Sequence, residues 1–284
     1  MVKRFLFDTV LYVLLASVAF ITVYPLLYIV AVSFSDPASI VQNKVALWPK
    51  GFNIEAYREL LHHPKIPRAY LNTILYTSVG TFINLAMTAV AAYPLSRPEF
   101  SGRKLALVAI VLTMFLNGGI IPTYIIVQKL HLLNTIWAIV LPNAIWTIEL
   151  LLLKSFYEAM SSSLRESAKI DGASEYRILL SIVIPLSKPA IASIGLFFFM
   201  GHWNSFFLPM IYMNDADKYP LQVVLRDMLI LGQAKENDPI GNSSIPPQAL
   251  KNATIFLSLV PVLAIYPFAQ KYFAKGIMLG AEKG

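Results

Sequence analysis

Two titratable side chains lie deep inside apolar stretches of the sequence, and they are its first candidates for chemistry. Glu149 interrupts the stretch "IWTIELLLLK", and His202 lies within "FFFMGHWNSFF". If these stretches cross a bilayer, a carboxylate there costs at least ~2.5 kcal/mol, so it faces protein or water rather than lipid. Glu149 therefore either forms hydrogen bonds within a helical bundle or borders a route for a polar solute.

Other kinds of chemistry lack the residues they need. The chain has no cysteine and four scattered histidines without a metal-binding spacing, so we expect no disulfide and no bound metal. The apolar stretches contain no nucleophile paired with a base, which argues against a membrane-embedded enzyme. A G-x-x-x-x-G-K-[ST] sequence is also missing, so the chain cannot hold nucleotide phosphates in a P-loop.

The composition places the chain in a membrane. Apolar residues make up 57% of its 284 residues, more than a soluble domain of this size can bury in one core. A helix needs about 20 apolar residues to cross about 30 Å of hydrocarbon, and six stretches reach that length. We therefore expect an all-α membrane protein, a single domain of residues 1–284 with six transmembrane helices. The expected spans cover residues 5–34, 70–95, 105–128, 136–157, 182–212 and 253–272.

The first of these stretches begins after two basic residues, as a signal peptide would. Its apolar part is much longer than the roughly 7–15 residues of a cleaved signal, so we expect it to stay as a transmembrane helix.

The basic residues predict the orientation. If the N-terminus is cytoplasmic, six spans return the C-terminus to the same side. The cytoplasmic segments then hold 13 of the 23 Lys and Arg residues: Lys3, Arg4, Arg97, Arg103, Lys104, Lys154, Arg165, Lys169, Arg177, Lys188, Lys271, Lys275 and Lys283. The outside segments are longer in total but hold the other 10, which agrees with the positive-inside rule. Because the basic residues are spread over short loops, we expect no nucleic-acid partner.

Two long loops, residues 35–69 and 214–252, are expected outside. Long loops usually have a function, and a docking surface is the obvious one. The second contains "LQVVLRDMLILGQ", whose helical spacing fits a helix along the membrane surface or beneath a partner. A solvated connector is the alternative.

A polar segment, residues 159–185, concentrates charge in a chain that is only 14% charged. Its charged side chains include Arg165, Glu166, Lys169, Glu175 and Arg177. Its apolar positions are small or of medium size. The segment fits two alternatives, an amphipathic helix at the membrane interface or a projection that fits a groove on another protein.

Local signals divide the polar segment into two helices. Ser163 and Glu166 have the spacing of a capping box and predict the start of the first helix. Gly172 is the residue type best able to adopt the left-handed turn that ends a helix. A second helix, residues 173–184, is expected to merge with the fifth span at Pro185.

The polar segment also follows a known order: Glu166, Ser167, Ala168, three residues, Gly172, nine residues, and then Ile182-Val183-Ile184-Pro185. This order resembles the EAA motif, E-A-A-x3-G-x9-I-x-L-P, of importer permeases of the ATP-binding cassette (ABC) class. It departs from the motif at Ser167 and Ile184, where Ala and Leu are usual, and both changes in volume are small.

Longer strings extend the resemblance over nearly the whole chain. "ESAKIDGAS", "PLSKPAIASIGLFF", "GHWNSFF" and "YPLQVVLRDMLI" resemble carbohydrate permeases of the maltose type. More narrowly, they are similar to the subfamily that imports complex oligosaccharides, including those derived from uronate-containing polysaccharides.

The resemblance implies a type I ABC importer permease fold in which the polar segment is a cytoplasmic coupling segment. This segment would dock into a cleft on an ATPase subunit. The expected coupling residues are Glu166, Ser167, Ala168, Asp171, Gly172, Ala173 and Pro185. Gly172 would set the bend, and the small side chains of Ser167 and Ala168 would let the helix seat closely. The C-terminal tail is either frayed or, as the resemblance implies, reaches between the ATPase subunits.

The implied partners are a second permease subunit, an ATPase dimer, an extracellular substrate-binding protein, an oligosaccharide substrate and membrane lipid. The chain would then be a transport subunit without an enzyme activity of its own. It would carry no cofactor, because the partner ATPase subunits would bind ATP and Mg. The expected location is the bacterial cytoplasmic (inner) membrane.

A sugar route needs hydrogen-bonding side chains and flat aromatic faces, and both kinds occur inside the apolar stretches. The candidates are Asn117, Tyr124, Asn143, Glu149, His202, Trp203 and Asn204. Successive helical residues project about 100° apart, so at most one or two of the three in "HWN" point into a pore. For the others, packing between helices is an equally valid interpretation.

An ion-coupled secondary sugar transporter is the alternative function. Such a protein normally has coupling carboxylates and interrupted helices in matched halves of its chain. A single carboxylate, Glu149, and the lack of an evident internal repeat argue against it.

Overall fold

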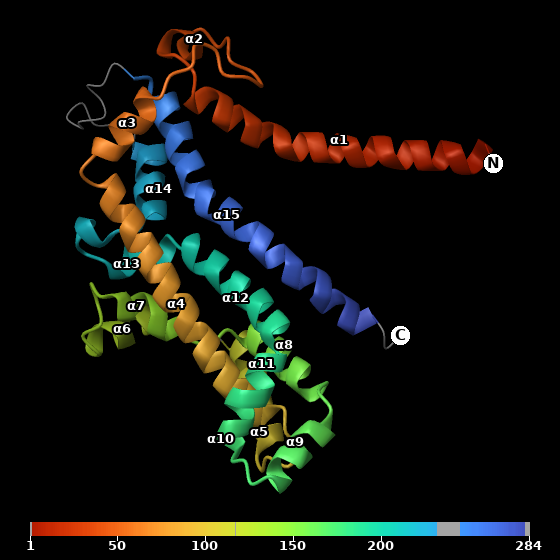
Figure 1. The fold of residues 1–284 in the computed structure, drawn as a ribbon. Coiled ribbons are helices and arrows are strands. Elements are labelled where there is room, and N and C mark those ends of the chain that lie inside the picture. Colours follow the sequence, from red (N-terminus) through yellow and green to blue (C-terminus); the bar gives the residue numbers. More distant parts are fainter. Residues whose placement is uncertain (1, 117, 232–244, 282–284) are drawn as a thin grey trace. The chain divides into compact units, whose positions relative to one another are not determined.

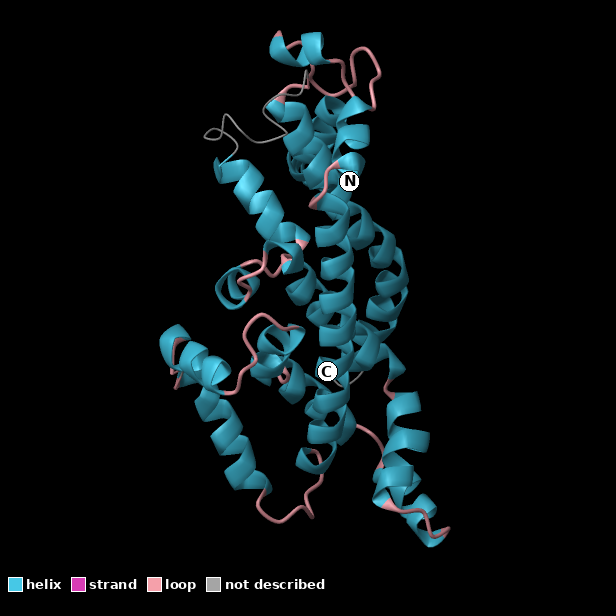
Figure 2. Ribbon diagram, turned by 90° about the vertical axis from the view of Figure 1, so that its left-hand side faces the viewer, coloured by secondary structure: helices cyan, strands magenta, loops and turns pink. Residues whose placement is uncertain are grey.

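The computed structural model describes residues 2–116, 118–231 and 245–281 (Figure 1). These residues form helices joined by turns and loops and contain no β-strand (Figure 2). The all-α prediction is therefore confirmed for the described part of the chain. Two compact units are formed, Met1–Arg68 with Val224–Pro261, and Ala69–Val223 with Val262–Gly284.

The first unit contains three helices from the N-terminal part of the chain, α1 (Val2–Ser33), α2 (Pro37–Val41) and α3 (Glu55–His62). Helix α1 includes the apolar stretch Phe7–Ser33. In the most apolar part of this stretch, no residue is buried by the rest of the chain. A helix that is apolar all round and unburied needs an apolar surrounding, which a bilayer or another subunit provides.

The loop after α1 is folded back on the end of that helix. The Asp36 carboxylate caps α2 by accepting from the Ser39 backbone N–H at 2.9 Å, and this bond lowers the pKa of Asp36. The Phe34 ring stacks on Tyr57, with 4.7 Å between centroids, and on Phe52 at 5.6 Å. The predicted outside loop, residues 35–69, is thus held in place by a cap and an aromatic cluster.

The second unit contains most of α4 and the helices from α5 to α13. Their bounds are α4 (Ile66–Leu95), α5 (Arg103–Phe115), α6 (Ile120–Lys129), α7 (Ile136–Val140), α8 (Thr147–Glu158), α9 (Ser162–Ile170), α10 (Glu175–Ile178), α11 (Ile184–Leu186), α12 (Lys188–Trp203) and α13 (Phe207–Tyr212). Short 3-10 turns lie at Leu141–Asn143 and Ala216–Lys218, and a π-helical turn at Leu179–Val183. The last two helices, α14 (Leu221–Leu231) and α15 (Pro247–Ala281), each have residues in both units.

The helices provide three to six candidate membrane spans among the described residues. Three are single helices, Phe7–Ser33, Ile66–Leu95 and Pro247–Pro267. The other three are pairs of helices on either side of a break: Arg103–Phe115 with Ile120–Lys129, Ile136–Asn143 with Thr147–Glu158, and Glu175–Leu186 with Lys188–Trp203. Each candidate overlaps one predicted apolar stretch.

The fifth predicted span, residues 182–212, is not one continuous helix, and this corrects the sequence prediction. The chain bends by 81° at Ser187, and the next helix ends at Trp203. Pro189 is the second residue of α12, and its ring cannot fit against the preceding helical turn, so the helix breaks just before it. The fourth span likewise bends by 52° between its two helices. Apolar length alone does not reveal such breaks.

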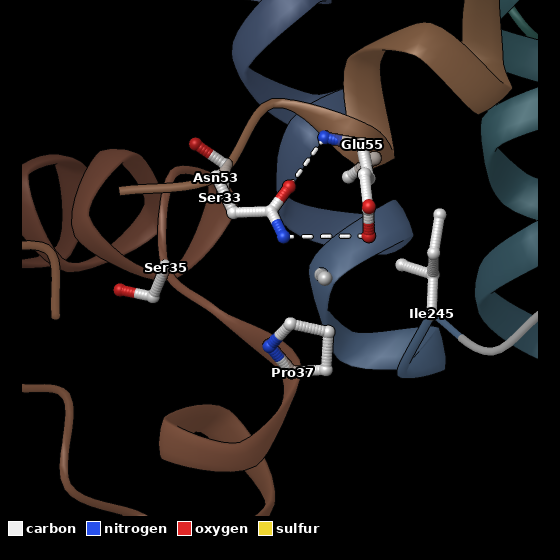
Figure 3. A pocket seen from close by; sticks show the side chains of 8 residues that line it. Ser33, Ser35, Pro37, Asn53, Glu55 and Ile245 are labelled. Atoms are coloured by element: carbon white, nitrogen blue, oxygen red, sulfur yellow. Dashed lines mark hydrogen bonds between the residues drawn. The ribbon is translucent and has the colours of Figure 1, made fainter. Parts of the chain in front are cut away.

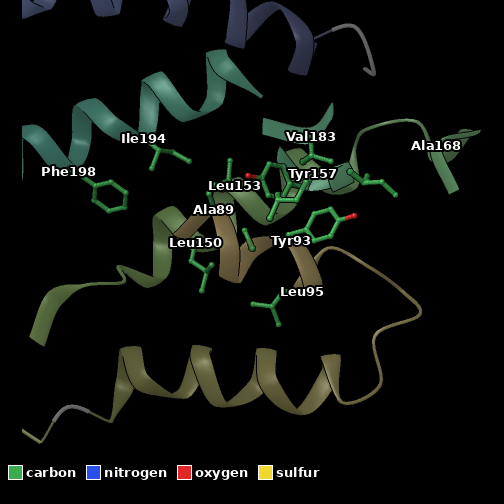
Figure 4. Packing of buried hydrophobic residues seen from close by; sticks show 13 residues of the cluster. Ala89, Tyr93, Leu95, Leu150, Leu153, Tyr157, Ala168, Val183, Ile194 and Phe198 are labelled. Carbon is green, nitrogen blue, oxygen red and sulfur yellow. The ribbon is translucent and has the colours of Figure 1, made fainter. Parts of the chain in front are cut away.

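The main hydrophobic core of the second unit joins α4, α8 and α12 to the helices of the polar segment (Figure 4). Its buried members are Ala89, Ala92, Tyr93, Leu95, Leu150, Leu153, Tyr157, Ala168, Ile178, Leu179, Val183, Ile194 and Phe198. Because Ala168 and Ile178 belong to this core, α9 and α10 are anchored to the helical bundle rather than free of it.

Helix α14 realises the helical spacing predicted for the second long loop. Its first residues, Leu221, Val223 and Leu225, are buried, and the Leu221 N–H donates to the Thr73 hydroxyl at 2.7 Å. The start of this helix thus packs within its own chain, which corrects the interpretation of it as a solvated connector.

Candidate functional site

The first helix of the polar segment, α9, begins two residues earlier than the capping box predicts. Ser161 is the N-cap, without a side-chain cap bond, and the Ser161 and Ser163 hydroxyls lie 2.7 Å apart. The predicted exchange between Ser163 and Glu166 is therefore wrong, because Ser163 already lies inside the helix and its hydroxyl has another partner.

The bend at Gly172 is confirmed. Its φ is +78°, in the left-handed region that favours glycine. The Gly172 N–H donates to the Lys169 carbonyl at 3.0 Å, and the Ala173 N–H donates to the Ala168 carbonyl at 2.9 Å. These two bonds form a Schellman motif, which satisfies the last carbonyls of α9 and fixes the direction in which the chain leaves it.

The second helix of the polar segment starts at Glu175 rather than at residue 173. Ser174 caps it, with its hydroxyl accepting from the Arg177 N–H at 3.3 Å. Gly172 and Ala173 form the turn bonds, and Ser174 is the cap, which explains the later start. The helical path continues through the π-helical turn and α11, which contains Pro185.

Ion pairs and one tyrosine hold the bent segment to the end of α4. The Arg165 guanidinium contacts both oxygens of Glu99, which lies in the loop between α4 and α5. Lys169 Nζ lies 2.5 Å from Glu175, and the Tyr93 hydroxyl donates to the same carboxylate at 2.5 Å. The two sides of the Gly172 bend are therefore linked to each other and to α4.

The Arg165 contact has the largest electrostatic effect in this region. Its hydrogen bonds to Glu99 lower the pKa of that carboxyl to about 2, and Glu99 in turn raises the pKa of Arg165. Both groups are charged at neutral pH. Because the Glu99 side chain is well exposed, solvent and salt screen this pair.

The predicted coupling residues divide between two faces of the polar segment. Ala168 is buried in the chain's own core, and Ala173 packs against that core. The exposed side chains include Glu166, Ser167, Asp171, Ile170 and Tyr176. Ile170 is 87% exposed and Tyr176 is 70% exposed, although both are apolar enough to favour burial. The outer face therefore combines two apolar projections with charged side chains of both signs, because Lys169 and Arg177 are exposed as well.

A cavity of about 210 Å³ lies within the second unit and brings together predicted and unpredicted residues. We call it the Trp146 cavity, and it is lined by Ile139, Asn143, Trp146, Gly201, His202, Ser205 and Leu208. A pocket in the first unit, near Asn53 and Glu55, has only about 10 Å³, space for roughly one water molecule (Figure 3). Of these two, only the Trp146 cavity has room for part of a solute.

Buried hydrogen bonds hold one wall of the Trp146 cavity. The Asn84 amide nitrogen donates to the Asn143 carbonyl at 2.6 Å, and Asn84 Oδ1 lies 2.6 Å from His202 Nε2. Because this oxygen can only accept, His202 Nε2 carries the proton, and Nδ1 is left as an acceptor in the neutral ring. Asn84 is fully buried, so both of its partners depend on it.

Two glycines permit the close packing of these rings. A Cβ on Gly80 would lie 2.6 Å from the imidazole of His202, and a Cβ on Gly201 would collide with the indole of Trp146. The Trp146 ring also packs edge-on against Phe198, with 5.1 Å between centroids. The cavity wall is therefore formed by side chains that have little freedom to move.

The other members of the "HWN" triplet lie away from this cavity. Trp203 is 2% exposed and packs on Tyr70 and Phe199. Asn204 is exposed, and its amide donates to the Met200 carbonyl at 2.9 Å. As expected from helical geometry, one residue of the triplet, His202, lines the cavity.

The remaining route candidates are separate from one another. Asn117 lies outside the described residues. Tyr124 stacks on Tyr212, with 6.1 Å between centroids. Glu149 is partly buried in the first turn of α8, where the partial positive charge of a helix start favours a carboxylate. It does not line the Trp146 cavity.

Sequence reasoning missed Asn84 and Trp146. Asn84 is an amide side chain within an apolar stretch, which is a signal of a buried hydrogen-bonding role. Trp146 follows the break after Asn143, and apolar length gave no sign of that break.

Comparisons with known proteins decide what kind of protein carries these two sites. Residues 69–279 match the family described as binding-protein-dependent transport system inner membrane component. The chain is a member of this family. The resemblance inferred from the EAA-like order and the longer strings is therefore confirmed, and this favours an ABC permease over an ion-coupled transporter.

Individual relatives are similar to the permease along its whole length. The protein LplC of Bacillus subtilis is 42% identical over 98% of this chain and 95% of its own. The polygalacturonan/rhamnogalacturonan transport system permease protein YtcP of Bacillus subtilis is 40% identical over 99% of this chain and 100% of its own.

A solved structure supports the fold. A chain from a bacterial ABC transporter involved in the import of the acidic polysaccharide alginate is 33% identical to the permease, with a TM-score of 0.91. The match covers 95% of the permease and 98% of that chain. The permease therefore has the helical fold of an ABC importer permease.

Proposed function

We propose that the chain is one of two permease subunits of an ATP-driven importer that takes up oligosaccharides derived from acidic polysaccharides. The likeness to the alginate importer chain supports this most directly, because it extends over nearly all of both chains. The relative that is described as a polygalacturonan/rhamnogalacturonan permease points to the same class of substrate. The substrate would cross the bacterial cytoplasmic membrane without chemical change.

The proposed topology has six spans in one permease domain, with both termini in the cytoplasm. The three single helices would be three of the spans, and each bent pair would form one more. The excess of basic residues on one side of the predicted topology supports the orientation. The exposed length of α1 would contact lipid or the second permease.

The polar segment is the proposed contact with the ATPase dimer, which would bind ATP and Mg. The side chains of Glu166, Ser167 and Asp171 are exposed, and so are the projections formed by Ile170 and Tyr176. Since Gly172 fixes the bend and the core fixes Ala168, a push on this outer face would reach α4 and α8. A conformational change needs such a difference in contacts between two states.

The long loops are the proposed contact with an extracellular substrate-binding protein. The family description names dependence on such a protein. The first loop presents Trp48, whose side chain is 80% exposed, beside a folded and capped backbone. Exposed aromatic side chains on an ordered surface are typical of protein interfaces.

Uptake by a purified complex tests the proposed function. The chain is co-expressed with a second permease and an ATPase from the same transport system, placed in liposomes with ATP inside, and supplied with the binding protein and labelled trigalacturonate. We expect ATP-dependent accumulation of trigalacturonate and of an alginate trisaccharide, and little accumulation of maltotriose.

Two outcomes would contradict this proposal. One is sugar uptake by the isolated chain driven by a proton or sodium gradient. The other is failure of the chain to assemble with an ATPase in membranes, since the polar segment would then have no partner to receive motion from.

A further inference from the structure

The Trp146 cavity has the size for one sugar ring rather than for an oligosaccharide. Its volume of about 210 Å³ is below the roughly 300–1,000 Å³ of sites that enclose drug-sized ligands. It would hold several waters, at ~30 Å³ each, when no solute is present. A single pyranose unit is a solute of matching scale.

The cavity offers the two kinds of surface that a pyranose presents to a protein. The partly buried Trp146 ring supplies a flat face for the C–H groups of a sugar. His202 Nδ1 can accept a hydrogen bond, and it has no partner among the residues that the structure describes. The Ser205 hydroxyl can donate and accept, and it likewise forms no hydrogen bond with a described residue.

These groups are held in place before any ligand arrives. Asn84 fixes the His202 ring through its other nitrogen, and close packing on Gly80 and Gly201 restricts both rings. A preformed site loses less conformational entropy on binding than one that must order its side chains.

The charge of the lining selects which part of the sugar can enter. The seven lining residues include no Lys, Arg, Asp or Glu. A uronate carboxylate in this cavity would lose water without gaining an opposite charge, which is costly. Ring faces and hydroxyl groups meet no such cost.

We propose that the Trp146 cavity is a subsite that binds one pyranose ring of the moving oligosaccharide through its C–H face and hydroxyls, and leaves its carboxylate outside. This inference rests on the proposed function. It assigns Trp146, His202 and Ser205 to direct sugar contact, and Asn84 to the positioning of His202.

Because the chain contains no cysteine, a single introduced thiol can report on the cavity. Ser205→Cys places it in the lining, and Asn204→Cys places it on the neighbouring exposed residue, outside the lining. Each variant is assembled with its partner subunits in nanodiscs and labelled with a small thiol reagent, with and without trigalacturonate.

Trigalacturonate at ten times its half-saturating concentration should slow labelling of the Ser205→Cys thiol about tenfold, because occupied sites exclude the reagent. Labelling of the Asn204→Cys thiol should change little. Equal slowing of both thiols, or none at either, would overturn the subsite. If a lipid chain or a side chain of a partner fills the cavity, the Ser205→Cys thiol will be unreactive even without sugar. That result would also overturn the subsite.

A second variant pair tests the aromatic face by transport. Trp146→Leu should lower the maximal rate of trigalacturonate uptake by about threefold to tenfold, the loss expected when a stacking contact is removed. Trp137→Leu is the matched control, since Trp137 lies outside the lining. Equal rates for the two variants would overturn the role of Trp146. Absence of uptake by the unmodified complex would instead count against the proposed function.

Discussion

The polar segment and the Trp146 cavity are built from opposite kinds of interaction. The polar segment is held by ion pairs at partly exposed positions, such as that between Arg165 and Glu99 in the loop after α4. The cavity wall is held by buried bonds between neutral groups, through Asn84. Exposed ion pairs can break and re-form at small cost, whereas a buried amide has no water to replace its partners. A segment proposed to transmit motion and a site proposed to keep its shape differ in this way.

Gly172 should give the largest effect in the polar segment. Gly172→Val forces a β-branched residue into the left-handed region, at a cost of roughly 1–2 kcal/mol or more, although a Cβ there meets no atom within 4 Å. We expect the Schellman turn to be lost and trigalacturonate uptake to be abolished, while membrane insertion persists. Uptake in liposomes and fractionation of membranes measure the two quantities.

Two control variants separate the bend from general strain. Gly172→Asn should retain much of the uptake, because asparagine tolerates this conformation. Gly102→Val introduces the same strain outside the polar segment, at a φ of +88°, and should also retain uptake. If both controls lose as much uptake as Gly172→Val, the bend is not the cause.

Asn84 should give the largest stability effect in the cavity. Asn84→Leu leaves the His202 ring and the Asn143 carbonyl without their partner, and a buried group without a partner costs about 1–3 kcal/mol. We expect a lower unfolding temperature for the assembled complex. Asn204→Leu removes only the bond of an exposed amide to the Met200 carbonyl, which water can replace, so it should stay within about 0.5 kcal/mol of the unmodified chain. Equal unfolding temperatures for the two variants would contradict the contrast between the regions.

The sequence predicts the features that depend on local residue types. Each predicted apolar stretch overlaps a single helix or a bent pair of helices, and the position of Gly172 between two polar helices predicted the bend there. The sequence predictions were wrong where the local pattern was ambiguous or uninformative. The serines at 161–163 all have capping chemistry, so spacing alone chose the wrong one, and the bend at Ser187 lies inside an apolar stretch.

The cavity could be predicted only in part, because its residues meet through the fold. His202 and Asn143 stood out as polar groups in apolar stretches. Asn84 bonds to Asn143, which lies 59 positions further along the chain, and to His202, which lies 118 positions further. No local sequence pattern encodes such a pairing. The contact of Trp146 with Gly201 is equally distant in sequence. The structure shows where the predicted coupling residues lie. Their contact with an ATPase stays a prediction.

Loss of the Tyr93 hydroxyl should destabilise the polar segment by less than loss of Asn84 destabilises the cavity. Tyr93→Phe removes the hydroxyl that donates to Glu175, and because half of the Glu175 side chain is exposed, we expect a loss of about 0.5–1.5 kcal/mol. Tyr157→Phe is a matched control in the same core, because the buried Tyr157 hydroxyl has no partner among the described residues. We expect a lower unfolding temperature for the first variant and an unchanged or higher one for the second. The reverse order would show that the Tyr93 bond does not hold the polar segment.

The ion pair between Glu99 and Arg165 should give the smallest effect, and one that depends on pH and salt. The pKa of Glu99 is lowered to about 2 from an ordinary value of 4.5, so its contribution to stability is complete above that ordinary value. The contribution is lost as the pH falls from about 4.5 towards 2. The unfolding temperature of the unmodified complex should therefore exceed that of Glu99→Gln at pH 7, and the difference should shrink below about pH 4.5 and in 1 M salt. Arg165→Gln should abolish the same difference, and the double variant should add nothing further. The difference in unfolding temperature between the unmodified and Glu99→Gln complexes could instead persist at high salt and low pH. The pair would then behave like a buried, salt-independent contact, which would contradict the contrast with the Trp146 cavity.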